Sequence, residues 1–234
     1  MNEQKRLARI GGVLYLLIAI LGGFAEGYME PKMYVAGNAV ATALNVVTNS
    51  GLVRMGVVAD LLDGTIFIFL AMVLYVLLKQ VHKSVARAML VLVALATSIT
   101  CLVAVFEFEG LRVATDSTYA AAMGTAGSNA LVLLLLDMQH YGLLVAQIFF
   151  GLWLAPLGYL AYKSGLFPKA LGVALVVGCV CYLVDLFAAF LVPGFGAAIH
   201  GFVTIPSAIA ELWMVGYLLL IGVKTAKPDI PAAA

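Results

Sequence analysis

Long apolar stretches follow one another along the chain, and short segments that carry most of the charged residues separate them. Each stretch has about 20 residues, which at about 1.5 Å per residue is enough for a helix to cross a hydrocarbon core of about 30 Å. The pattern predicts an all-α polytopic membrane protein, a bundle of six transmembrane helices. The predicted spans are about 9–29, 55–78, 86–107, 140–162, 169–192 and 203–223.

Composition agrees with this class of protein. Of the 234 residues, 64% are hydrophobic and only 11% are charged, against about 25% charged in a soluble globular domain. The net charge is +1 and no basic run with interleaved aromatic residues occurs, so nucleic acid is excluded as a partner and the lipid bilayer is expected. We expect one domain over residues 1–227 and a disordered tail, PDIPAAA, over 228–234.

The basic residues are distributed unequally between the two sides of the predicted membrane. Ten of the thirteen Lys and Arg fall on the side of the termini and of the turns after the second and fourth spans. The positive-inside rule therefore predicts that both termini are cytoplasmic. Those ten residues are Lys5, Arg6, Arg9, Lys79, Lys83, Arg87, Lys163, Lys169, Lys224 and Lys227, and the outer side holds Lys32, Arg54 and Arg112.

Two longer connections are predicted on the outer side, over about 30–54 and 108–139. In the first, Asn38, Thr42 and Asn45 share one helical face, which indicates an extra interfacial or re-entrant helix. The second connection is rich in Ala, Gly and Ser, and is compatible with an extension of the fourth helix or with a segment along the membrane surface. His200 is expected at the surface of a short outer loop.

Ten of the twelve acidic residues lie in the outer half of the predicted bundle. Glu26, Asp63, Asp185 and Glu211 each stand thirteen to seventeen residues from the nearest cytoplasmic Lys or Arg, and therefore roughly 20–25 Å from that side. A charge at such a depth costs about 2.5–3.5 kcal/mol unless it faces water or a partner. Their similar height on four helices predicts a polar cavity that opens outward.

Helical spacing adds further residues to this cavity. Asp60 shares a face with Asp63, and Gln147 continues the face of His140 inward. Arg54 would offset the acidic charge, and Thr42 and Asn45 would close the cavity from outside. The cavity is expected to bind a cation or a small polar ligand, and no catalytic residue can be assigned.

Several chemical interpretations of these acids remain open. They can form hydrogen bonds and ion pairs between helices without any ligand. A metal site of His140, Asp63, Asp185 and Glu211 would suit zinc, manganese or iron and would support a hydrolase that acts on a lipid-like substrate. Alternatively, protonation of the intramembrane acids would serve a proton-coupled carrier of small molecules.

Four segments of the chain resemble a family of bacterial membrane proteins known as domain-of-unknown-function family 4386. They are ARIGGVLYLLIAILGGFAE, GNAVATALNVVTNSGLVRMGVVADLLD, DMQHYGLLVAQIFFGLWLAPLGYLAYKSGLFPKALGVALVVGCVCYLVD and IPSAIAELWMVGYLLLIGVK. The resemblance implies one domain in the bacterial inner membrane and supplies no activity. It also places a set of residues within the motif blocks of the family, with Asn38 at a position where the family often carries an acid. That set is Glu26, Thr42, Asn45, Arg54, Asp60, Asp63, His140, Tyr182, Asp185 and Glu211.

Overall fold

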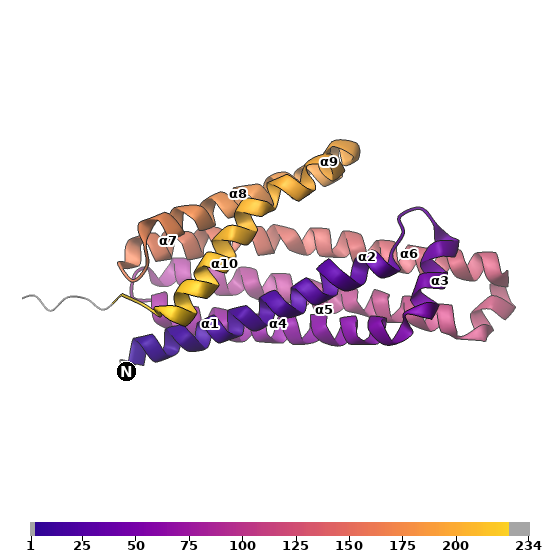
Figure 1. Ribbon diagram of the computed structural model, residues 1–234, viewed down its shortest axis with the longest axis horizontal. Helices are drawn as coiled ribbons and strands as arrows, with labels where there is room; N and C mark the ends of the chain where they lie inside the picture. Colours follow the sequence, from indigo (N-terminus) through magenta and orange to yellow (C-terminus); the bar gives the residue numbers. More distant parts are fainter. Residues whose placement is uncertain (1–2, 225–234) are drawn as a thin grey trace, which may run out of the picture. The chain divides into compact units, whose positions relative to one another are not determined.

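The computed structural model describes residues 3–224, which form helices and turns with no strand among them. The expected disordered tail, residues 228–234, and Lys227 lie outside the described residues. Figure 1 shows the elements in chain order. They are α1 (Glu3–Gly22), the π-helix η1 (Gly23–Met29), α2 (Glu30–Met33), α3 (Ala39–Thr48), α4 (Ser50–Leu78), α5 (Lys83–Thr115), α6 (Ser117–Leu152), α7 (Leu154–Ser164), α8 (Lys169–Leu191), α9 (Pro193–Val203) and α10 (Ile205–Leu220).

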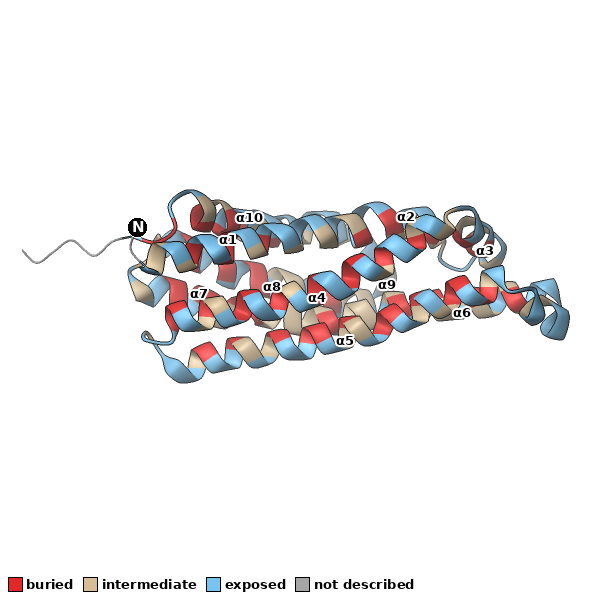
Figure 2. Cartoon of the chain, turned by 90° about the horizontal axis from the view of Figure 1, so that it is seen from below, coloured by how far each residue is buried: buried red, intermediate tan, exposed pale blue. Residues whose placement is uncertain are grey.

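Among residues 3–224, six helical stretches are long and apolar enough to cross a membrane, which confirms the predicted all-α polytopic class. Large apolar side chains such as Val58, Phe69 and Val105 are more than half exposed on these helices, as expected for surfaces that contact lipid. Figure 2 shows buried and exposed positions alternating along α4 and α5. The six stretches are Glu3–Met33, Ser50–Leu78, Lys83–Thr115, Ser117–Ser164, Lys169–Leu191 and Gly194–Leu220.

The connection at 108–139 is helical and extends the neighbouring helices. α5 continues to Thr115, the chain turns at Asp116, and α6 begins at Ser117. The side chain of Asp116 accepts a hydrogen bond of 2.9 Å from the backbone N–H of Thr118 and thereby caps the start of α6. Within α6, Gly124 has a φ of +72°, which interrupts the regular helix because only glycine adopts this conformation without strain.

The chain divides into two compact units. Among the described residues, unit 1 comprises 3–13, 72–90 and 151–224, and unit 2 comprises 14–71 and 91–150. Several long helices contribute residues to both units. The candidate residues are therefore described below within the unit to which each belongs.

Unit 2 has a core where η1, α2 and α3 meet the start of α4, the end of α5 and the middle of α6. Buried apolar side chains of these elements form one cluster there. α3 contributes its buried face to that cluster and runs across the direction of α4, α5 and α6 (Figure 1). With ten residues, α3 is about 15 Å long, too short to cross a bilayer. Representative core residues are Met29, Met33, Val46, Val53, Leu111 and Leu136.

The segment between α2 and α3 is held by local hydrogen bonds. Gly37, with a φ of +72°, makes the turn, and Asn38 caps α3 by accepting the N–H of Ala41 at 3.0 Å. The hydroxyl of Thr42, which is fully buried, both donates to the carbonyl of Val35 and accepts its N–H, each at 3.1 Å. Thr42 therefore closes this turn.

In unit 1, α8 packs against α7, α9 and α10. Gly158 of α7 and Gly172 of α8 allow the closest approach, because a Cβ at Gly158 would lie 2.6 Å from the carbonyl oxygen of Gly172. Gly165, with a φ of +69°, ends α7, and Pro168 precedes α8. The hydroxyl of Ser207 on α10 donates to the carbonyl of Gly178 on α8 at 2.9 Å.

Candidate functional site

Four carboxyl groups of unit 2, which we name the carboxyl cluster, come from three elements. Glu26 lies on η1, Asp60 and Asp63 lie on α4, and Glu107 lies on α5. Electrostatic repulsion couples Glu26 with Asp60 and Asp63, and Glu107 with Asp60. The structure thus places Glu26, Asp60 and Asp63 near one another, together with Glu107.

Glycines on the neighbouring helices leave room for these carboxyl groups. A Cβ at Gly56 would lie 3.1 Å from Oε1 of Glu107, and a Cβ at Gly22 would lie 3.9 Å from Oδ1 of Asp63. Gly56 precedes Asp60 by four residues and so shares a face of α4 with it. The side chain of Glu107 is therefore directed from α5 toward the face of α4 that carries Asp60.

Within residues 3–224, the buried members of the cluster have no basic partner. Asp60, Asp63 and Glu107 are 6%, 8% and 0% exposed, and none of them forms an ion pair there. Oδ1 of Asp63 and both carboxyl oxygens of Glu107 also have no hydrogen-bond partner in this part of the chain. Unsatisfied buried polar atoms are rare in proteins, so a group of them requires an explanation.

η1 carries Glu26 on a π-helix of seven residues. A π-helix has a wider turn than an α-helix, and such segments are frequent at functional sites. Glu26 itself is exposed, in contrast to Asp60, Asp63 and Glu107. The cluster thus combines three buried carboxyl groups with one that solvent or a ligand can reach.

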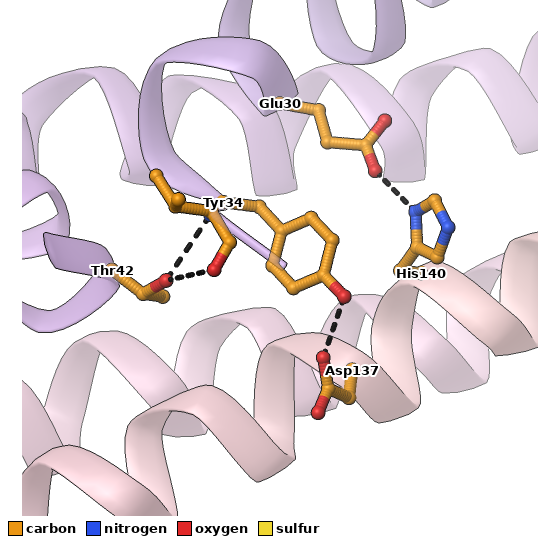
Figure 3. A network of polar contacts seen from close by, with 6 residues as sticks. Glu30, Tyr34, Thr42, Asp137 and His140 are labelled. Carbon is orange, nitrogen blue, oxygen red and sulfur yellow. Dashed lines mark hydrogen bonds and ion pairs between the residues drawn. The ribbon is translucent and has the colours of Figure 1, made fainter. Parts of the chain in front are cut away.

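A second group of polar residues, the aromatic network, consists of Glu30, Tyr34, Asp137 and His140 (Figure 3). Nδ1 of His140 lies 2.7 Å from Oε1 of Glu30, and the hydroxyl of Tyr34 donates to Oδ1 of Asp137 at 2.6 Å. The rings of Tyr34 and His140 stack with centroids 5.1 Å apart. These contacts tie Glu30, the first residue of α2, and Tyr34, which follows α2, to α6.

Glu30 connects the aromatic network with the carboxyl cluster. Its charge is electrostatically coupled to Glu26, Asp60 and Glu107, while its carboxylate pairs with His140. Glu30 therefore links His140, a titratable base, to the carboxyl cluster. In the same network, burial and the hydrogen bond to Asp137 raise the pKa of Tyr34 above its ordinary value, so the phenol remains a donor.

Four other expected site residues of unit 2 lie outside both groups, and one of them, Thr42, closes the turn before α3. Asn45 is on α3, where its backbone carbonyl accepts the side-chain amide of Asn49 at 2.9 Å. Arg54 is exposed near the start of α4, with its guanidinium 6.0 Å from the ring centroid of Phe108. Gln147 is half-buried on α6, seven residues after His140.

The remaining expected residues, Tyr182, Asp185 and Glu211, belong to unit 1. The hydroxyl of Tyr182 on α8 donates to Oε1 of Glu211 on α10 at 2.9 Å. Asp185 is buried, and its Oδ1 lies 3.0 Å from Nδ1 of His200 on α9. The expectation for His200 is therefore wrong in one respect: it is exposed, but it lies on a helix and pairs with a buried acid.

No metal-binding arrangement occurs among the described residues. The expected ligands were His140, Asp63, Asp185 and Glu211, but no group of three or more His, Cys, Asp or Glu side chains in residues 3–224 is placed to hold a metal ion.

Glu107 is the member of the site that the sequence pattern misses. The predicted third span ends at residue 107, which places Glu107 at the membrane boundary, whereas α5 continues to Thr115. The sequence nevertheless contains a signal, because small or polar residues recur at helical spacing along this segment and end at Glu107. The structure buries all of them: Thr97, Thr100, Ala104 and Glu107.

A family model comparison assigns the chain to a known group of sequences. The model described as domain of unknown function (DUF4386) matches residues 10–222, which is most of the chain and includes both groups of polar residues. The chain belongs to the DUF4386 family. No curated protein and no solved structure matches this DUF4386 chain.

Proposed function

We propose that this DUF4386 protein binds a cation at the carboxyl cluster, through side chains that move toward the cation as it binds, and that protons compete for the same carboxyl groups. Glu107 carries the proposal, because it is fully buried with both oxygens unpartnered among the described residues and is directed toward Asp60. An ionised carboxylate in apolar surroundings is too unfavourable to remain uncompensated. The cluster must therefore hold protons or an external cation.

Two features support the exchange of a cation or a proton between the carboxyl cluster and the surroundings of the protein. Glu26 is exposed and electrostatically coupled to the buried acids, so it offers an entry point for a positive ligand. Glu30 and His140 form a pair next to the cluster, which provides groups able to accept or release protons. A proton-coupled carrier is a specific form of this proposal and requires that the site become accessible from both sides.

The proposal can be tested by the thermal stability of the purified protein in detergent. The probes are chloride salts of sodium, potassium, magnesium, manganese and zinc, and tetramethylammonium chloride. A ligand at 100 times its Kd stabilises the native state by about 2.7 kcal/mol. We expect at least one probe to raise the Tm in a saturable manner, and we expect lower pH to weaken the effect.

Matched variants connect this response to the cluster. Asp63→Asn and Glu107→Gln should abolish the Tm shift, since each removes one of the charges that would face the cation. Glu109→Gln is the control, because Glu109 lies on the same helix but pairs with Arg112 at 2.8 Å on the exposed side. A complete lack of response to all six probes, or an unchanged response in both cluster variants, would contradict the proposal.

We also propose that the protein resides in the bacterial inner membrane with both termini in the cytoplasm. The positions of ten of the thirteen Lys and Arg support this orientation. In a variant without Cys101, Cys179 and Cys181, single cysteines at Lys83 and Ala122 can be labelled in intact cells with a thiol reagent that does not cross membranes. Labelling only at position 122 is expected, and labelling only at position 83 would reverse the orientation.

A further inference from the structure

We propose that an open groove on unit 2 binds an anionic phospholipid, with an acyl chain along the groove and the phosphate at Arg54. The groove has a volume of about 530 Å³, within the range of roughly 300–1,000 Å³ for sites of small molecules. Ile20 and Phe24 line one side, and Met55, Val58 and Leu62 of α4 line the other. Arg54 is the one charged residue of its lining, which otherwise is apolar.

With the middle of α4 placed at the centre of the bilayer, Arg54 comes to the level of a lipid headgroup. Gly64 is the middle residue of α4 (Ser50–Leu78), and Arg54 precedes it by ten residues, or about 15 Å. This equals half of a hydrocarbon core of about 30 Å. Leu62 lies eight residues beyond Arg54, about 12 Å deeper, so the groove leads from the headgroup level into the hydrocarbon region.

The charge of Arg54 is available to a lipid phosphate. Within residues 3–224, no carboxylate lies within ion-pair distance of Arg54, and its guanidinium is 6.0 Å from the ring centroid of Phe108. The comparable outer residue Arg112 is instead paired with Glu109 at 2.8 Å. A guanidinium group binds phosphate through two parallel hydrogen bonds. Phosphatidylcholine also has a phosphate, but its choline cation repels Arg54, so the net charge favours an anionic lipid over a zwitterionic one.

The groove itself is open toward the surroundings of the chain. Ile20, Met55 and Val58 are 57%, 61% and 54% exposed. In a bilayer such side chains meet acyl chains, and a hollow between two helices holds one chain in a defined place. The combination of an apolar hollow with one unpaired cation at its outer end is therefore complementary to a phospholipid with a net negative charge.

Native mass spectrometry of the detergent-purified protein tests this proposal. The probes are phosphatidylglycerol, phosphatidylcholine with the same acyl chains, and glycerol phosphate, which has the anionic group without the chains. We expect one phosphatidylglycerol to bind more tightly than phosphatidylcholine and glycerol phosphate not to bind measurably. Arg54→Gln should weaken phosphatidylglycerol binding about fivefold, the equivalent of about 1 kcal/mol, and should weaken phosphatidylcholine binding less, because the choline cation offsets the charge of its phosphate.

Two further variants separate the groove from the rest of the surface. Val58→Trp should weaken the binding of both lipids because the indole fills the groove, whereas Val105→Trp, at a residue 53% exposed on α5, should have no effect. Arg112→Gln is the control for loss of an outer positive charge. Equal binding of the two lipids by the parent, an equal loss in Arg54→Gln and Arg112→Gln, or tight binding of glycerol phosphate alone would each overturn the proposal.

Discussion

Oε1 of Glu107 on α5 lies over Gly56 on α4, 3.1 Å from the position that a Cβ at Gly56 would occupy. The thioether of Met29 fills the rest of that space. The absence of a side chain at Gly56 is thus what allows a carboxyl group of one helix to reach the acidic face of another. The carboxyl cluster should therefore be sensitive to the addition of even one methyl group at Gly56.

Gly56→Ala should destabilise the protein and weaken its response to cations. The added methyl group would overlap the buried side chain of Met29 and press against Glu107, and overpacking of this kind costs about 1–3 kcal/mol. Thermal unfolding in detergent measures the change. Gly51→Ala on the same helix is the control, since a Cβ there meets nothing within 4 Å and should be neutral or stabilising by up to about 1 kcal/mol.

Glu107→Met should make the protein more stable while abolishing the proposed cation response. Methionine has a similar length, and it removes two buried oxygens that lack partners among the described residues. Leaving such a group unsatisfied costs about 1–3 kcal/mol, and this is the expected gain in the free energy of unfolding without added cation. A loss of stability instead would mean that Glu107 is already satisfied in the native protein.

Tyr34→Phe should lower the free energy of unfolding by about 0.5–1.5 kcal/mol, the usual contribution of one hydrogen bond. The variant loses the 2.6 Å bond to Asp137 but keeps an aromatic ring against His140. Tyr28→Phe is the control, because Tyr28 is 52% exposed. Ultraviolet absorption during an alkaline titration provides a second measurement, since burial and Asp137 raise the pKa of Tyr34 and should delay its ionisation.

The cap at Asp116 should contribute stability that depends on pH. Hydrogen bonds from the backbone and the hydroxyl of Thr118 lower the pKa of Asp116 below its ordinary value. Its ionised form is thus favoured in the folded state, so the stabilisation is present at neutral pH and is lost as the pH falls through the lowered pKa.

Asp116→Ala should accordingly be less stable than the parent at neutral pH, with a difference that shrinks in acid. Asp116→Asn keeps an oxygen that can accept from Thr118 but cannot titrate, so its difference from Asp116→Ala should not depend on pH. Thermal unfolding of the three proteins across a pH series checks both points. A difference between the parent and Asp116→Ala that is constant at every pH would show that the charge of Asp116 has no part in the cap.

Hydropathy and helical spacing were sufficient to predict the all-α class and six candidate spans, because each span depends on the composition of its own residues. Local spacing also placed Asp60 and Asp63 on one face of α4. Both inferences need only the geometry of a single helix.

Which side chains meet depends on contacts between helices and was decided only by the tertiary structure. His140 pairs with Glu30, 110 residues earlier in the chain, although Asp137 is its neighbour on the same helical face. Glu107 becomes buried because α5 continues past it and Gly56 leaves space opposite. Two further contacts likewise depend on how the chain folds back. Thr42 closes the turn before α3, and His200 pairs with Asp185.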